Sequence, residues 1–125
     1  MRLDLVMPAH NEERRIDTTL RDYRTALRDV DARIWVALDG CDDGTAEIVR
    51  RHAAEDPRVG WIEFPKLGKG GVLVEALRTC AAGDGEAVGF VDADGAPPPE
   101  ELLRLLDVVE RGADVAIASR RHPAA

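Results

Sequence analysis

A chain of 125 residues in which 45% of the side chains are hydrophobic is long and apolar enough for one domain with a buried core. Its formal net charge of -7 argues against a nucleic-acid-binding protein, which needs a basic face. Charges of both signs are interspersed along the chain, so the charged fraction of 33% does not indicate disorder.

Short apolar runs alternate with amphipathic stretches whose apolar residues recur at three- and four-residue steps, which indicates strands alternating with helices. In chain order the sequence predicts a strand at Leu3–Met7, a helix at Glu12–Arg28, a strand at Ile34–Leu38, a helix at Thr45–Ala54, a strand at Val59–Phe64, a helix at Lys69–Ala82, a strand at Ala87–Val91, a helix at Pro98–Glu110 and a strand at Val115–Ala118. Strands that are apolar on both faces and alternate with helices predict one α/β domain over residues 1–125, a three-layer α/β/α sandwich with a mostly parallel sheet.

The cysteines and the apolar runs give an expected location. Cys41 and Cys80 fit neither a zinc site nor a CxxC redox pair, so we expect reduced thiols in a cytoplasmic protein. Met1–Met7 does not have the features of a secretory signal, and no apolar run approaches the length of a transmembrane segment. Any action on a lipid-linked molecule would therefore be peripheral, from the membrane surface, or would need a partner.

Two carboxylates follow the predicted strand Ala87–Val91. In a parallel sheet, ligands bind beyond the carboxyl ends of the strands. Asp92 and Asp94 are one residue apart at such an end, so both can reach one hard cation such as Mg²⁺ or Mn²⁺. The alternative is a simple strand-terminating turn, because Asp and Gly favour turns.

The ends of the first two predicted strands also carry polar residues with two interpretations each. Asp39 is placed to read a base or ribose, or else it is a turn or helix-capping acid. Asn11 and Glu12 suit the start of a helix, and His10 is either a ligand contact or a structural residue.

Two further segments suit phosphate binding. The segment Gly68-Lys69-Gly70-Gly71 enters a helix, where glycines allow close approach of a phosphate and Lys69 adds charge, although a flexible helix entry explains it as well. Arg120 ends the predicted fifth strand and can hold a phosphate bidentately, with an ordinary surface arginine as the alternative.

Five segments in register resemble glycosyltransferase family 2, and the branch they resemble most is the polyprenol (dolichol) phosphate sugar synthases. They are Val6–Glu13, Asp39–Thr45, Gly68–Gly71, Asp92–Leu102 and Ala113–Arg120. The resemblance implies a Rossmann-like nucleotide-sugar-binding domain of the GT-A fold. The chain departs from the family at Leu38 and Cys41, where an acid and a serine are common. It also has Gly95 and Ala96 after the DAD segment, where the polyprenol-phosphate branch commonly carries a glutamine two residues on.

The resemblance implies nucleotide contacts at the first two strand ends. Pro8, Ala9, Asn11 and Glu12 match the nucleotide-binding loop of the family, and Asp39 matches an acid that contacts the base or ribose.

The same resemblance implies that Asp92, Ala93 and Asp94 form the DxD segment, in which Asp92 and Asp94 bind Mg²⁺ or Mn²⁺ and so hold the donor diphosphate. Lys69 and Arg120 are the implied stabilisers of the phosphates. The sequence identifies no catalytic base.

The implied function is a metal-dependent, inverting glycosyltransferase that moves a sugar from a UDP- or GDP-linked donor to an acceptor such as a polyprenyl phosphate. The alternatives are a nucleotide-sugar-binding module without complete catalytic machinery, and a sugar nucleotidyltransferase. The resemblance ends soon after the predicted fifth strand, so we expect that the acceptor-binding segment is absent. An incomplete fold would expose apolar surface, which favours a homodimer.

Overall fold

The computed structural model describes residues 2–83, 85–95 and 98–112. The strands are β1 (Leu3–Ala9), β2 (Ala32–Asp39), β3 (Val59–Phe64) and β4 (Ala87–Phe90), and the helices are α1 (Ile16–Ala26), α2 (Thr45–Glu55), α3 (Lys69–Ala81) and α4 (Pro99–Glu110). The predicted strand at Val115–Ala118 lies outside the described residues. Every other predicted element is present in the predicted order.

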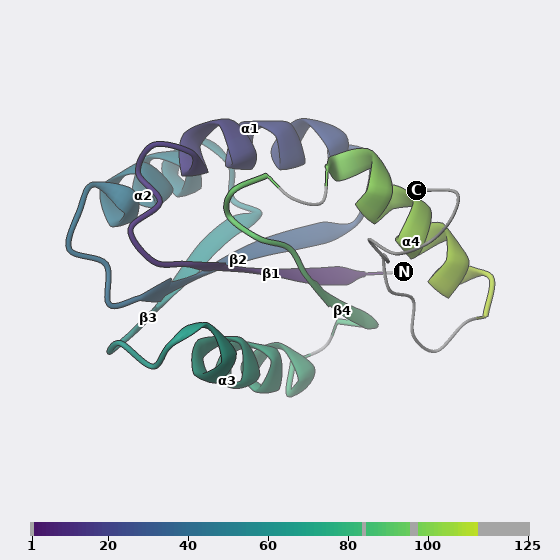
Figure 1. The fold of residues 1–125 in the computed structure, drawn as a ribbon. Coiled ribbons are helices and arrows are strands. Elements are labelled where there is room, and N and C mark those ends of the chain that lie inside the picture. Colours follow the sequence, from purple (N-terminus) through teal and green to yellow (C-terminus); the bar gives the residue numbers. More distant parts are fainter. Residues whose placement is uncertain (1, 84, 96–97, 113–125) are drawn as a thin grey trace, which may run out of the picture.

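The strands form one parallel sheet in the order β3-β2-β1-β4. Helices α1, α2 and α4 cover one face of the sheet and α3 covers the other, which gives the three predicted layers (Figure 1). Because all the strands run the same way, the loops that follow them gather at one edge. No helix in the described part of the chain is long and apolar enough to cross a membrane.

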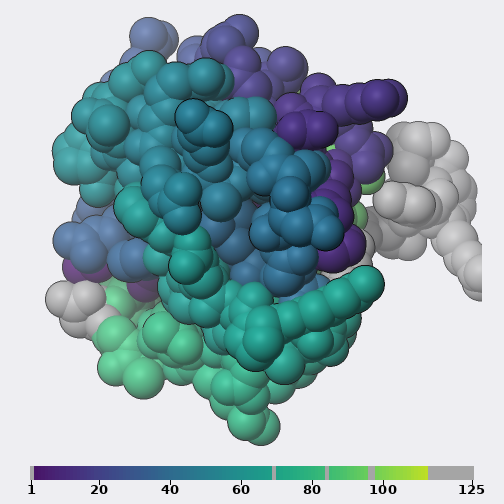
Figure 2. Space-filling view, turned by 90° about the vertical axis from the view of Figure 1, so that its left-hand side faces the viewer, coloured from purple at the N-terminus to yellow at the C-terminus, as the bar shows by residue number. Residues whose placement is uncertain are grey.

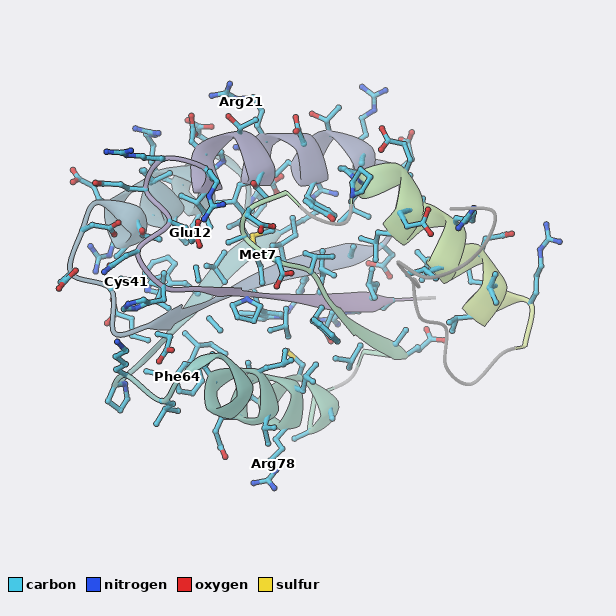
Figure 3. The ribbon with its side chains drawn as sticks, viewed as in Figure 1. Met7, Glu12, Arg21, Cys41, Phe64 and Arg78 are labelled. Atoms are coloured by element: carbon cyan, nitrogen blue, oxygen red, sulfur yellow. The ribbon has the colours of Figure 1, made fainter. Side chains whose placement is uncertain are left out.

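The core lies on both faces of β1, whose seven residues are all buried. Met7 points toward the α1 layer and belongs to the same buried cluster as Leu20 (Figure 3). Val6 faces the other way and packs with Val72 of α3. The prediction that the strands are apolar and buried on both faces therefore holds for β1.

The outer strands depart from that prediction. Exposed and less exposed residues alternate along β4, where 38% of Val88 and 54% of Phe90 is exposed. Burial likewise alternates along β3. The exposed side chains on β4 are apolar surface of the kind for which the sequence predicts a homodimer, and that oligomeric state stays a prediction.

Several predicted boundaries differ from the structure by a few residues, and the two at β1 and at the start of α1 can be followed in the local contacts. β1 continues through Pro8 to Ala9, although a proline was expected to end it. The Val6 carbonyl accepts from Val91 on the β4 side, so Pro8, two residues on, also turns its missing N–H toward that side and away from β2. α1 begins at Ile16 rather than Glu12, because residues 13–15 form a turn.

Candidate functional site

A cavity of about 280 Å³ lies at the carboxyl edge of the sheet. Figure 2 shows this edge, where the segments after β1 (purple), β2 (blue) and β3 (teal) lie next to one another. The described residues that line the cavity are Pro8, Ala9, His10, Glu12, Asp39, Lys66, Gly68, Val72, Asp92, Ala93 and Asp94. Seven predicted site residues therefore come together from three strand ends that are distant in the sequence.

The remaining predicted site residues do not line the described part of this cavity. Asn11 lies beside it and makes a different contact, given below. The backbone of Lys69 begins α3, but its side chain lies outside what the structure describes, as does the whole of Arg120.

Ala93, the residue between Asp92 and Asp94, is buried and anchors the acid pair in the core. Val91 continues the ladder past the end of β4, with its N–H 3.0 Å from the Val6 carbonyl. Ala93 is only 3% exposed and packs in the core cluster that contains α1 residues. Asp92 on one side of Ala93 and Asp94 on the other are both less buried than Ala93, and both line the cavity.

The acid pair lies within a turn whose central residues are 93 and 94, so the turn that the sequence offers as an alternative is present as well. Gly95 has a φ of 92°, which favours glycine, and its N–H lies 3.4 Å from the Asp92 carbonyl. Behind the turn, α1 contributes Tyr23, which is fully buried. Burial, followed by the negative charges of Glu100 and Asp92, raises the pKa of Tyr23 to about 12. This hydroxyl therefore stays protonated at neutral pH behind the acid pair.

Asp39 has a structural contact that its predicted role did not include. It is 3% exposed, and its Oδ1 accepts a hydrogen bond from the Leu67 backbone N–H at 2.6 Å. The neighbouring Gly40 N–H donates to the Phe64 carbonyl at 3.0 Å. Asp39 therefore fastens the loop after β3 to the end of β2, while it also lines the cavity.

The loops after β1 and β2 are fastened to each other as well. The Asn11 Oδ1 accepts from the Asp42 backbone N–H at 3.0 Å, and the Glu12 N–H donates to the Thr45 hydroxyl at 2.8 Å. The Glu13 Oε2 accepts from the Gly44 N–H at 2.9 Å. Asn11 adopts a φ of 50°, a left-handed conformation that asparagine tolerates better than most residues. These hydrogen bonds join the loop after β1 to the loop after β2 and to the start of α2.

The first turn of α2 is held by Asp43. Its Oδ1 accepts from both the N–H and the hydroxyl of Thr45, at 2.9 and 2.5 Å. Burial opposes ionisation of Asp43, but the hydrogen bonds from Thr45 and nearby backbone amides outweigh it and lower the pKa of the carboxyl group. A charged Asp43 at a helix N-terminus is favourable, as the sequence indicates for this position.

The two cysteines are free, as predicted. Cys41 lies at the same end of the sheet as Glu12 (Figure 3), and its Sγ donates to the Ala9 carbonyl at 3.3 Å. Burial, together with nearby carboxylates, raises the pKa of the Cys41 thiol. Cys41, which stands where the family more often has a serine, makes a hydrogen bond to the end of β1.

Lys66 is a site residue that the sequence reasoning missed. It is the one lysine or arginine side chain among the described residues that line the cavity. Its backbone lies against Gly40, where an added Cβ would come within 2.9 Å of the Lys66 Cβ and where φ is 56°. The signal for Lys66 is its position directly after β3, at the carboxyl edge of the sheet.

Carboxylates and other metal-binding side chains do not form a larger cluster here. Within residues 2–83, 85–95 and 98–112, no group of three or more His, Cys, Asp or Glu residues could hold a metal ion.

Comparison with known proteins supports the resemblance. The model of glycosyl transferase family 2 matches residues 4–124. The undecaprenyl-phosphate mannosyltransferase of Micrococcus luteus is 36% identical over 98% of this chain and 50% of its own length. The chain spans half or less of the length of the curated relatives it matches.

Solved structures show the same fold. A mannosyltransferase from Pyrobaculum calidifontis, in complex with GDP-Man and Mn²⁺, has a TM-score of 0.64 at 27% identity over 83% of this chain and 31% of that one. Glucosyl-3-phosphoglycerate synthase from Mycobacterium tuberculosis, in complex with Mn²⁺, UDP-Glc and phosphoglyceric acid, has a TM-score of 0.64 at 26% identity over 88% of this chain and 39% of that one. From its sequence and its parallel α/β architecture, the chain belongs to glycosyltransferase family 2 and has the GT-A type of fold.

Proposed function

We propose that this chain binds the nucleotide-sugar donor of a glycosyltransferase together with a divalent cation, and that the cavity at the carboxyl edge of the sheet is the donor site. One observation carries the proposal: Asp92 and Asp94 line the same cavity as Pro8, Ala9 and Asp39. The structurally similar enzymes from Pyrobaculum calidifontis and Mycobacterium tuberculosis bind Mn²⁺ with GDP-Man and UDP-Glc, respectively.

The acid pair fits Mg²⁺ or Mn²⁺. Both ions prefer oxygen ligands, and such sites commonly use one or two carboxylates with water and substrate phosphates as the other ligands. Asp92 and Asp94 supply two such carboxylates beside one cavity, and the cavity leaves room for the rest. When bound, the cation would act as a Lewis acid on the diphosphate.

The other residues that line the cavity then contact the nucleoside and the phosphates of the donor. Pro8, Ala9 and Val72 give an apolar surface for the base and ribose, and the carboxylate of Asp39 accepts an N–H or O–H of the nucleoside. Lys66 also lines the cavity, and its positive charge would stabilise the charge that develops on the leaving nucleoside diphosphate. Lys69 and Arg120 stay proposed phosphate contacts, as the family resemblance implies.

The proposed reaction transfers the sugar with inversion to a phosphate acceptor. A phosphate group is already a nucleophile, so the acceptor needs no catalytic base from the protein. A polyprenyl phosphate fits this requirement, and the Micrococcus luteus relative is an undecaprenyl-phosphate mannosyltransferase. Such an acceptor would place the protein peripherally at a membrane surface.

A donor-binding module is the second candidate. The chain spans half or less of the length of the relatives it matches, so transfer to an acceptor needs a test of its own besides donor binding. The sugar nucleotidyltransferase alternative loses its support, since the chain belongs to a glycosyltransferase family.

Calorimetry with UDP- and GDP-linked sugars, with and without Mn²⁺, tests the donor site. We expect weak binding without the cation, tighter binding with it, and loss of that gain in Asp94→Ala. Asp42→Ala is the matched control, because Asp42 is an exposed carboxylate at the same edge that does not line the cavity. If no nucleotide sugar binds, the proposal is wrong. Release of nucleoside diphosphate on adding polyprenyl phosphate would distinguish an enzyme from a binding module.

A further inference from the structure

A threonine on α1 reaches the backbone of the acid pair. The Thr19 hydroxyl lies 2.9 Å from the carbonyl oxygen of Ala93, the residue between Asp92 and Asp94. Thr19 is 4% exposed, so this contact is shielded from water. Figure 1 shows the segment after β4 rising to α1, which brings together residues that are 74 positions apart.

This contact acts on a short and otherwise defined piece of backbone. Upstream, the Val91 N–H is paired with Val6, and downstream the turn closes at Gly95. Between them, the Ala93 carbonyl belongs to the same peptide plane as the N–H of Asp94. A hydrogen bond that fixes this plane therefore fixes the direction in which Asp94 leaves the chain, and with it the spacing of the two carboxylates.

The contact of Thr19 is more than the local bond that helical threonines make. Thr19 also lies 3.0 Å from the Arg15 carbonyl, one turn earlier on its own helix. Thr25 and Thr79 make the same local bond, to Arg21 and Glu75, but both are exposed. A hydroxyl has one proton, so in Thr19 two carbonyls compete for it, and the second of them lies at the acid pair.

We infer that Thr19 is a positioning residue for the divalent cation of the donor site, acting through the Ala93 carbonyl on the geometry of Asp92 and Asp94. The inference rests on the proposed function. A purely structural role is the competing explanation, because a buried carbonyl needs a hydrogen-bond donor in any protein. The two explanations differ in what they predict for metal affinity.

Three variants separate them. Thr19→Val keeps the shape of the side chain and removes the hydroxyl, whereas Thr19→Ser keeps the hydroxyl. Thr25→Val is the matched control, because it removes an equivalent hydroxyl from the same helix far from the acid pair. The affinity for Mn²⁺ is measured by titration with UDP or GDP present, and the nucleotide affinity is measured again without metal. Thermal unfolding reports on the stability of each variant.

We expect Thr19→Val to weaken Mn²⁺ binding by about 10- to 100-fold, the usual effect of removing a group that orients a metal ligand. Its nucleotide affinity without metal should match that of the unchanged protein, and Thr19→Ser and Thr25→Val should bind Mn²⁺ normally. If Thr19→Val does not fold, Thr19→Ala takes its place with the same expected loss, because alanine favours a helix and cannot clash.

Two results would overturn the inference while leaving the donor site intact. One is metal-dependent nucleotide binding that is equally strong in Thr19→Val and Thr25→Val. The other is an equal loss of nucleotide affinity with and without Mn²⁺ in Thr19→Val, which a structural role predicts. Failure of the unchanged protein to bind nucleotide more tightly with Mn²⁺ would instead contradict the proposed function itself.

Discussion

Replacing Asp39 by alanine should detach the loop after β3 from the end of β2. In the structure the Asp39 carboxylate accepts from the Leu67 N–H at 2.6 Å and is 3% exposed, so the lost bond is short and charge-assisted. Hydrogen bonds to charged groups contribute about 1.5 to 3 kcal/mol. We therefore expect a loss of about 2 kcal/mol, within that range.

Asparagine at the same position gives an internal comparison. Asp39→Asn keeps an acceptor oxygen for the Leu67 N–H but removes the charge. A neutral hydrogen bond is about half as strong as a charge-assisted one, so the loss should be about 1 kcal/mol. Urea unfolding measures both changes as shifts in the midpoint at constant slope. Hydrogen exchange at the Leu67 amide should be fastest in the alanine variant.

The control for these measurements is Asp42→Ala, since Asp42 is exposed at the same edge of the sheet. Equal urea midpoints for Asp39→Ala and Asp42→Ala, with unchanged exchange at Leu67, would refute the reasoning. That result would mean that Asp39 contributes nothing to holding the loop. Its burial would then need another explanation, and its place beside the cavity would be its main role.

The glycines and the acid groups between helices give further predictions. Gly60→Ala should destabilise the fold by about 1 to 3 kcal/mol, because the added Cβ would lie 2.6 Å from the Trp35 ring. Gly70→Ala in α3 should instead stabilise the fold by about 0.5 to 1 kcal/mol, because nothing lies within 4 Å of the added Cβ. Urea midpoints that move the same way in both variants would contradict this pair. The hydrogen bond from His52 is the main cause that lowers the pKa of Asp17 below its usual 3.8. The carboxylate is thus favoured in the folded state, so its contribution to stability is complete above about pH 4 and is lost as the pH falls through the lowered pKa. Urea midpoints measured down this pH range should decline less steeply in His52→Gln.

The order of the elements was predictable from the sequence because each one carries its own pattern. β1 and β3 are short runs that begin and end near prolines, polar residues or glycines, and α1 repeats Ile16, Leu20 and Tyr23 on its buried face. The start of α1 was not predictable in this way. Residues 13–15 form a turn, and the Glu12 N–H just before it donates to Thr45, the first residue of α2 and 33 positions away, a contact for which the local sequence has no signal.

The candidate site likewise has one part that was predictable from the sequence and another that was not. The position of Asp92 and Asp94 at the carboxyl edge of the sheet follows from local features, because two acids come directly after an apolar strand. The resemblance implies only nucleotide contacts for Asp39 and Asn11. Their hydrogen bonds to Leu67 and Asp42 join residues about 30 positions apart, which a local pattern does not indicate. Thr19 was missed because a threonine in an amphipathic helix has no pattern that indicates a contact with another loop.

The hydrogen bonds between the three loops also bear on how this family can be redesigned. The loop after β1 is bonded to the loop after β2 through Asn11 and Asp42, and the loop after β3 is bonded to the end of β2 through Asp39 and Leu67. An insertion or deletion in one loop would shift the partners of the next. Grafting a donor preference from a relative should therefore succeed when all three loops are transplanted as a set, and a single-loop chimera should lose nucleotide binding altogether.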